Sequence, residues 1–589
     1  MMRRSRILVE ITGAGFALAV WGGCVGNVGS TSTGAAGAGA GGIVVSGSGG
    51  SAGSGAPSGS GGATGAAGSS PTSAYIPARI RRLTNAEYDA SVQALLGTGM
   101  APSVQFSFPP DARQGPTNSP AGPAFSVNDA QRVDPVLADK LDTAAQALVT
   151  EARASGKLTA LAPCANPTSG GEACAKTFVL SFGAKAYRRA LTDEEVTGLV
   201  SSPTSVYHVG ADGYTHDDGI DVLTRVLLQS AAFLYVTELG APGAAGAFAL
   251  TAGEIANALA YLLTSGPPDD MLLANAASGL LATPDGREQE ARRLLATPAG
   301  RARFVRVVRE WLGIDDVAYR EKAQSVYPAF ASVSQSMENE SRAFIDEVLN
   351  NGTGTLAELL TADWTIADAP LAAIYGVTSA GAGKRTSLAS VKRRGILNQG
   401  AFLSVFANSN SSHPVFRGVA LMRRIACLST ADPGALGIVV SFPAADASKT
   451  TRARFDAHTA DPGCASCHTT IDAFGFALEN FDGMGRMRTT ENNLPVDTKV
   501  TLSAGTDLDG TYADSTELGA ALAGSASVKT CLARQIFRSS AARSDATIEN
   551  VENAFVEIWK QLPANQQGRL ADVLVAYVRS SLFVQRRTP

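Results

Sequence analysis

The amino-acid sequence predicts a mainly α-helical protein of several domains, with few short strands. Apolar residues recur every three or four positions through long segments, for example 129–154, 218–240 and 334–349, which is the spacing of one buried helix face. Strand signals are confined to short stretches, 248–250 and 496–502. About 515 residues follow a low-complexity N-terminal region, which is enough for three or four domains.

A helix-start signal of the form Leu-Thr-x-x-Glu, followed by an apolar or aromatic residue, occurs three times in the chain. In each copy the Thr hydroxyl can cap the first turn, while the Glu carboxylate accepts a hydrogen bond from the backbone N–H of that Thr. We expect these capping boxes to begin helices and not to form a binding repeat. The three pairs are Thr84 with Glu87, Thr192 with Glu195, and Thr251 with Glu254.

The first 24 residues have the pattern of an export signal. Three arginines precede a mostly apolar run over Ile7–Val20, and two glycines precede Cys24. This arrangement predicts a bacterial lipoprotein site at Cys24, and an ordinary signal peptide cut nearby is the alternative. The apolar run is short for a membrane span, and no later stretch is long enough to be one.

Residues 25–75 form a Gly/Ala/Ser-rich tract that cannot bury a core, so we expect a disordered tether. A flexible chain of this length has an r.m.s. reach of roughly 40 Å. Such a tether suits a lipid-anchored protein held away from a membrane, or a secreted protein with a spacer.

The domain organisation that we predict is 1–24 signal peptide, 25–75 linker, 76–155 N-terminal helical module, 156–205 small helical module with a disulfide, 206–380 large helical module, 381–490 module with the cysteine motif described next, and 491–589 C-terminal helical module.

The most specific motif is Cys464-Ala-Ser-Cys467-His468, which is the Cys-x-x-Cys-His attachment pattern of a c-type haem. Residues three apart lie on one face of a helical turn, so both cysteines can reach vinyl groups of the same porphyrin. His468 can then be the proximal iron ligand. A zinc site needs four ligands, and no second Cys/His pair stands at zinc spacing. A redox dithiol favours a βαβ setting that is not evident here. A plain disulfide remains the other interpretation. Covalent haem attachment is completed outside the bacterial cytoplasm, so the predicted export signal supports the haem c interpretation.

The seven cysteines fit this interpretation. One can be lipidated at Cys24 and two can carry haem, which leaves an even number. The remaining four are Cys164, Cys174, Cys427 and Cys531. The first two flank a Pro/Gly-rich loop and predict a local disulfide. The last two bracket the haem segment and are a candidate pair, although spacing alone does not set connectivity.

A low-spin electron carrier needs a second axial ligand, and the sequence offers several. Met484 and Met487 lie in a Gly-rich loop, and a methionine ligand raises the reduction potential. His458, six residues before Cys464, competes with them, and His413 is a third candidate. An open sixth site would instead permit peroxide or small-ligand chemistry.

Two weaker patterns have ordinary structural explanations. His208, His216, Asp217 and Asp218 fall in a polar segment that we expect to be a solvated loop, with a metal site as the alternative. Asp507-Leu508-Asp509-Gly510 looks like part of a calcium loop but lacks the downstream Glu, so a turn is expected.

Seven separated phrases of the sequence carry a family resemblance. They are Arg81–Tyr88, Phe108–Asp111, Ala186–Thr192, Leu227–Tyr235, Arg393–Gly400, His413–Gly418 and Cys464–Asp482. Together they resemble a family of exported, multi-module bacterial proteins that is abundant in planctomycetes. The family's chains contain several domains of unknown function and end in a cytochrome-c-like module. The resemblance implies a haem-c-bearing envelope protein and implies no substrate.

We therefore expect a monohaem c-type cytochrome-like protein of the envelope, in the periplasm or as a surface lipoprotein, that transfers electrons to a redox partner the sequence does not identify. A haem-dependent oxidoreductase acting on an envelope substrate, or a non-haem surface binding protein, are the alternatives, so enzymatic activity stays open. The net charge of −4 gives no indication of nucleic-acid binding. Membrane contact is expected only through a lipid on Cys24.

Overall fold

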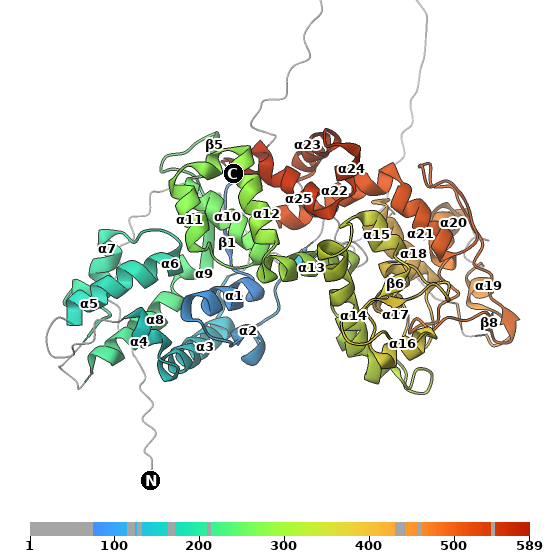
Figure 1. The fold of residues 1–589 in the computed structure, drawn as a ribbon, viewed down its shortest axis with the longest axis horizontal. Coiled ribbons are helices and arrows are strands. Elements are labelled where there is room, and N and C mark those ends of the chain that lie inside the picture. Colours follow the sequence, from blue (N-terminus) through green and yellow to red (C-terminus); the bar gives the residue numbers. More distant parts are fainter. Residues whose placement is uncertain are drawn as a thin grey trace, which may run out of the picture. The chain divides into compact units, whose positions relative to one another are not determined.

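The computed structural model describes residues 75–114, 124–126, 132–162, 171–208, 214–429, 443–444, 446–456, 462–543 and 548–588. The predicted signal peptide, the linker, Cys24, Cys164 and His458 lie outside the described residues. The chain is mainly helical with few short strands, which confirms the predicted fold class (Figure 1).

The elements follow one another in three groups. Up to Glu238 they are β1 (Arg79–Arg82), α1 (Asn85–Leu96), α2 (Pro102–Gln105), β2 (Arg113–Gln114), β3 (Phe125–Ser126), α3 (Pro135–Ala154), α4 (Lys157–Leu161), α5 (Gly171–Phe178), η2 (Val179–Gly183), α6 (Ala184–Tyr187), α7 (Asp193–Val196), η3 (Thr197–Ser201), α8 (His216–Gln229), α9 (Ala231–Leu234) and β4 (Tyr235–Glu238). The next group is β5 (Ala247–Ala249), α10 (Ala252–Thr264), α11 (Asp270–Ala277), η4 (Leu280–Ala282), α12 (Pro284–Leu295), α13 (Pro298–Leu312), η5 (Val317–Tyr319), α14 (Phe330–Asn350), α15 (Leu356–Thr361), β6 (Trp364–Thr365), α16 (Ala369–Tyr375), β7 (Thr386–Ser387), η6 (Ile396–Asn398), α17 (Gly400–Val405), α18 (Pro414–Ala420) and η7 (Leu421–Ile425). The last group is α19 (Thr451–Phe455), α20 (Pro462–Phe476), β8 (Thr490–Glu491), β9 (Leu494–Pro495), β10 (Val500–Leu502), β11 (Gly510–Tyr512), α21 (Ser515–Gly524), α22 (Ala526–Ala541), α23 (Ile548–Lys560), α24 (Ala564–Gln567), α25 (Leu570–Arg579), α26 (Ser581–Val584) and β12 (Gln585–Arg587).

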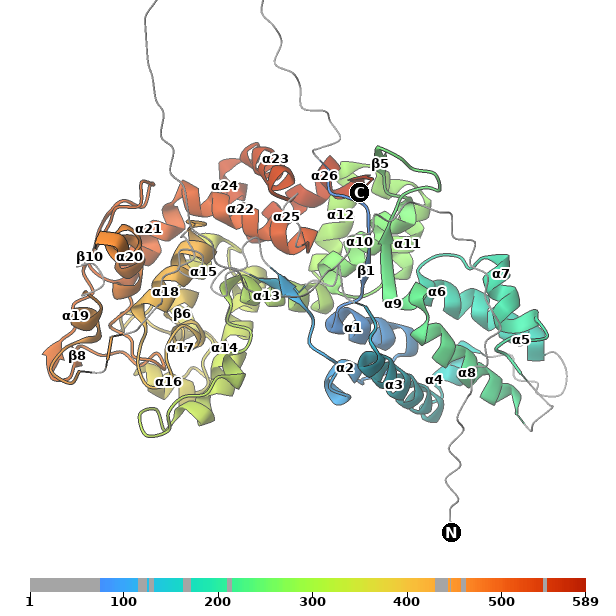
Figure 2. The ribbon, with the colours of Figure 1, turned by 180° about the vertical axis from the view of Figure 1, so that it is seen from behind.

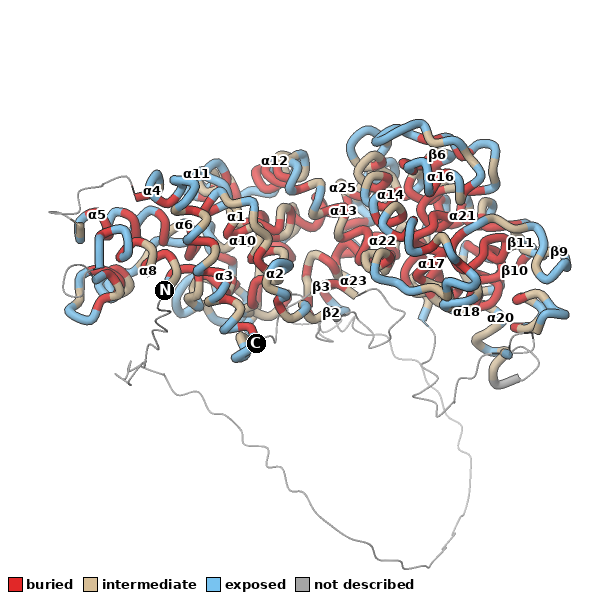
Figure 3. The backbone as a smooth tube through the Cα atoms, turned by 90° about the horizontal axis from the view of Figure 1, so that it is seen from below, coloured by how far each residue is buried: buried red, intermediate tan, exposed pale blue. Residues whose placement is uncertain are grey.

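Two large hydrophobic cores organise the described helices (Figure 3). The first is built by helices α1 to α9 and includes Leu96, Leu148, Phe178 and Leu227. The predicted modules 76–155 and 156–205, together with the start of the next module, therefore share one core.

The second core is built mainly by the elements from α10 to α26, and Ile76 and Phe125 from the start of the described chain also belong to it. Trp311, Phe344, Phe474 and Phe537 are all almost completely buried in it. The helix that carries the cysteine motif packs into this core together with helices of the predicted modules before and after it. It is therefore supported by long-range packing as well as by its own module.

Within the described ranges the strands form only antiparallel pairs, and two of these join distant parts of the chain. Strand β1 pairs with β4, and β12, near the C-terminus, pairs with β5 (Figure 2). The backbone N–H of Ala78 also donates to the carbonyl of Arg587. These contacts bring the first and the last described segments together.

All three predicted capping boxes are present and begin α1, α7 and α10, which confirms that prediction. A fourth box, between Thr215 and Asp218, begins α8. None of the helices within the described ranges has the length and apolar character needed to cross a bilayer.

Candidate haem site

Helix α20 carries the Cys-x-x-Cys-His motif in its first turns. Pro462 lies at the first position of the helix, where its missing N–H costs nothing. Cys464 and Cys467 follow at helical spacing, so they lie on one face, and both are partly exposed free thiols. The local sequence therefore places two reactive groups at an accessible position on a rigid element.

A buried carboxylate orients His468. The imidazole Nδ1 lies 3.0 Å from Oδ1 of Asp472, one turn further along α20. An ionised carboxylate can only accept, so Nδ1 donates, and the lone pair of the neutral ring is on Nε2. Asp472 is only 2% exposed, and its Oδ2 has no hydrogen-bond partner among the described groups. A histidine whose Nδ1–H is held by a carboxylate is the usual arrangement of a metal-ligating imidazole, so these residues fit a haem iron.

Two glycines let α18 pack closely against α20. A Cβ at Gly418 would overlap the carbonyl oxygen of Ile471, and one at Gly475 would overlap that of Pro414. Since the earlier residue of one helix meets the later residue of the other, the two helices run antiparallel. Extending this register places the cysteine motif opposite the π-helical turn η7.

A buried ion-pair network fixes the loop that follows α20. Arg417, which is fully buried, donates to the carbonyl oxygens of Leu478 and Phe481 and lies 3.4 Å from the Glu479 carboxylate. Arg488 and Ser412 also donate to Glu479. Buried charges of this kind are tolerated only when they are paired and hydrogen-bonded, so the network holds the loop in one conformation.

This loop contains the two methionines that the sequence offers as second iron ligands. Met484 is fully buried in the second core, and Met487 packs against that core. His468 lies eight residues, about 12 Å at 1.5 Å per residue, before the end of α20 at Phe476, and the loop begins beyond that end. The structure thus gives Met484 a packing role, and a methionine ligand stays a prediction. His458 lies outside the described residues.

His413 is positioned as a structural residue. It is fully buried, stacks on Phe416 and caps α18, where its Nδ1 accepts a hydrogen bond from the Phe416 backbone N–H. The proton of the neutral ring is therefore on Nε2. In this tautomer Nε2 has no free lone pair with which to bind a metal. Arg486 and Arg488, in the loop after α20, form ion pairs with carboxylates of the protein itself.

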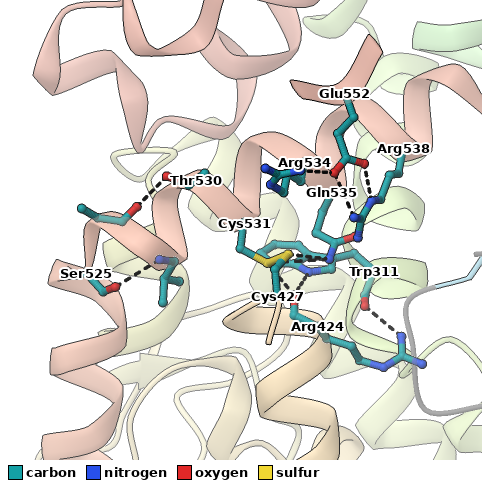
Figure 4. Close-up of a disulfide and its surroundings, with 12 residues drawn as sticks. Trp311, Arg424, Cys427, Ser525, Thr530, Cys531, Arg534, Gln535, Arg538 and Glu552 are labelled. Carbon is teal, nitrogen blue, oxygen red and sulfur yellow. Dashed lines mark hydrogen bonds and ion pairs between the residues drawn. A yellow bond between two sulfur atoms is a disulfide. The ribbon is translucent and has the colours of Figure 1, made fainter. Parts of the chain in front are cut away.

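Cys427 and Cys531 are joined by a disulfide that links the end of η7 to α22 (Figure 4). The amide of Gln535 lies 3.4 Å from the Cys427 sulfur, and the indole N–H of Trp311 donates to the nearby Arg424 carbonyl. Cys174 is also disulfide-bonded, while Cys164 lies in a segment that is not described.

The weaker sequence patterns are parts of ordinary structure. The His216 ring is buried and hydrogen-bonded to the Tyr207 hydroxyl at 2.6 Å, and Asp218 closes a capping box. Asp507 accepts from the Ser525 hydroxyl and the Ala526 N–H at the start of α22. Across the described ranges no group of three or more His, Cys, Asp or Glu side chains is arranged to hold a metal ion.

Comparison with protein families found four matches, all to multi-domain families of the planctomycete type. Each is described as a protein of unknown function, so the matches establish an order of modules and no activity. The abbreviated name of one of them, PSCyt3, suggests a cytochrome-like character, and its match includes the Cys464–His468 motif. The matches are PSD3 (DUF1587) over 81–154, PSD5 (DUF1595) over 174–238, PSD4 (DUF1592) over 250–377 and PSCyt3 (DUF1588) over 393–491. No curated protein and no solved structure matches the chain.

Proposed function

We propose that the chain is a monohaem c-type cytochrome-like protein that transfers electrons in the bacterial envelope. The observation that carries the proposal is the combination of two accessible thiols on one face of α20 with an adjacent His468 held by buried Asp472. The PSCyt3 match over the same residues supports it.

Each residue has a defined role in this proposal. Cys464 and Cys467 would hold the porphyrin through thioether bonds to its two vinyl groups. His468 would be the iron ligand through Nε2, while Asp472 fixes the ring orientation and would make the imidazole a stronger donor. When bound, haem supplies one-electron redox chemistry at its iron. The close α18–α20 packing and the Arg417 network keep this frame rigid.

The proposed location follows from the N-terminal sequence. A signal over residues 1–24, lipidation of Cys24 and the tether over residues 25–75 would deliver the helical part to the outer face of a membrane. Covalent haem attachment is completed outside the bacterial cytoplasm, so export and the haem motif support each other.

The proposal is tested by a pyridine haemochrome spectrum of protein exported by a host that matures c-type cytochromes. We expect the spectrum of a thioether-linked haem, which disappears in the Cys464→Ala/Cys467→Ala double variant. Ser466→Ala, an exposed change between the two cysteines, is the matched control and should keep the signal. A folded, colourless wild-type protein would instead leave the surface binding protein as the remaining interpretation.

A further inference from the structure

A charged cavity lies where segments that are distant in the sequence meet. Its volume is about 80 Å³, several times the ~10–15 Å³ that one water needs. Strands β1 and β4, helices α10 and α13, the end of α22 and strand β12 contribute to its walls. Six arginines and four carboxylates line it, which leaves an excess of two positive charges.

Several of these arginines are neutralised by carboxylates in the wall. Arg81 forms a two-point ion pair with Glu87, with distances of 2.6 and 2.9 Å. Glu238 receives hydrogen bonds from Arg79 at 3.1 Å and from Arg586 at 2.6 Å. These ion pairs balance the charges of Arg79, Arg81 and Arg586, so these three arginines do not need a further anion.

Arg303 and Arg306 differ from the others. Neither meets a carboxylate within 4.0 Å in the described part of the chain; Arg303 donates to the Leu262 carbonyl at 3.3 Å, and Arg306 donates to the Ser265 hydroxyl. They lie three residues apart on α13 and therefore share a helix face. Both are partly exposed, so their remaining N–H groups can reach a ligand in the cavity.

The two guanidinium groups also disfavour each other's charge. Burial, followed by the charge of Arg303, lowers the pKa of Arg306 to about 10. The carboxylates of Glu310, Glu87 and Asp111 oppose this lowering of the pKa only in part. Like charges held together in a poorly solvated place stay unfavourable until enough opposite charge joins them. A bound anion would remove this penalty.

Ser265 is an independent sign of a built site. It ends α10 with a φ of 57°, in the left-handed region that favours glycine, although Gly266 follows it directly. Its side chain is 4% exposed and its hydroxyl contacts Arg306 in the cavity wall. Non-glycine residues held in this conformation cluster at ligand sites, where the strain positions a side chain.

We propose that Arg303, Arg306 and Ser265 form a binding site for a small organic oxyanion, with a carboxylate or phosphate as its recognised group. A guanidinium presents two parallel N–H donors that match two oxygens of either group. Apolar side chains such as Leu262 and Phe583 line other parts of the cavity and can cover the body of the ligand. The site lies on elements other than α20 and does not depend on haem.

The test is calorimetric titration of the full-length protein, in chloride buffer of constant ionic strength, with malonate, with inorganic phosphate and with neutral malonamide. We expect saturable binding of malonate or phosphate, and the arm that binds identifies the recognised group. Arg303→Gln and Arg306→Gln should each weaken binding at least tenfold. Arg301→Gln, on the same helix but outside the cavity lining, is the matched control and should bind like the wild type.

A second readout separates binding from a structural role. Because the two arginines repel each other without a ligand, Arg306→Gln should melt at the same temperature as the ligand-free wild type or higher, and should lose the ligand-induced rise. Failure of both anions to bind, equal binding of malonamide, or unchanged affinity in both glutamine variants would each overturn the proposal. A clear fall in the melting temperature of ligand-free Arg306→Gln would also contradict it.

Discussion

At the scale of single residues, the buried carboxyl group of Glu340 has a strongly raised pKa. Its carboxyl group is 1% exposed on α14 and accepts hydrogen bonds from the hydroxyls of Thr365 and Tyr375, each at 2.6 Å. Burial, which outweighs these hydrogen bonds, raises the pKa of Glu340 to about 7. The folded protein therefore holds this proton over a pH range in which the unfolded chain has released it.

This raised pKa makes stability fall as pH rises. The contribution of Glu340 is fully present below its unfolded pKa near 4.5 and is lost as pH approaches 7, by roughly 3 kcal/mol in total at ~1.4 kcal/mol per pKa unit. A glutamine at this position cannot titrate. We therefore expect the free energy of unfolding of Glu340→Gln to rise by up to roughly 3 kcal/mol relative to that of the wild type between pH 5 and pH 8. Urea unfolding at both pH values measures this change.

Glu347→Gln, on the same helix, is the control for this experiment. The pKa of Glu347 is lowered, first by its hydrogen bond from Asn351, so this carboxyl releases its proton at a lower pH than an ordinary glutamate. The stability difference between this variant and the wild type should stay constant from pH 5 to pH 8. A constant difference for Glu340→Gln as well would show that the buried carboxyl titrates normally.

At the scale of elements, the crossing of α18 and α20 is the contact that positions the candidate haem site. Gly475→Ala places a Cβ against the Pro414 carbonyl, so the two helices must separate. We expect a loss of roughly 1–3 kcal/mol in the free energy of unfolding, together with a lower yield of haem-loaded protein. Urea unfolding and the haemochrome absorbance measure the two effects.

Gly253→Ala is the matched control, because a Cβ at this helical glycine meets nothing within 4 Å. Replacing it should stabilise the protein by about 0.5–1 kcal/mol, since alanine loses less conformational freedom on folding. Equal stability of the Gly475→Ala and Gly253→Ala variants would mean that the helix crossing is not tightly packed.

Sequence reasoning succeeded at this scale where the signal is local. The Thr84, Thr192 and Thr251 boxes were predictable because both partners lie within four residues of each other. The box at Thr215 was missed, because Asp218 takes the place of Glu in the searched pattern. Which of Met484 and Met487 can reach the iron depends on how the chain beyond Phe476 folds back toward His468, which local spacing does not specify, so a methionine ligand stays a prediction.

The larger features of the molecule could not be predicted in the same way. The cavity brings Arg81, Ser265, Arg306 and Arg586 together, and no local spacing relates such positions. The two cores likewise depend on which helix faces meet, which periodicity does not specify. The cysteine motif could be predicted because its chemistry lies within five consecutive residues.

At the scale of the whole molecule, the Cys427–Cys531 disulfide closes a loop with a sequence separation of 104. This loop contains α20. The cross-link restricts the unfolded chain, and in the chain-entropy estimate this raises the free energy of unfolding by roughly 4–5 kcal/mol. We expect the Cys427→Ser/Cys531→Ser double variant to unfold at a clearly lower urea concentration than the wild type. Reducing agent should lower the stability of the wild type by more than that of the variant, which keeps the disulfide of Cys174. Coincident unfolding curves for the two proteins would contradict this constraint.

The central claim is that one haem is attached through Cys464 and Cys467. The most direct measurement is peptide mapping by mass spectrometry of the full-length protein exported by a host that matures c-type cytochromes. We predict that the peptide containing both cysteines carries the mass of one haem. An unmodified or disulfide-bonded peptide, from folded protein in a host that matures a control cytochrome, would contradict the account.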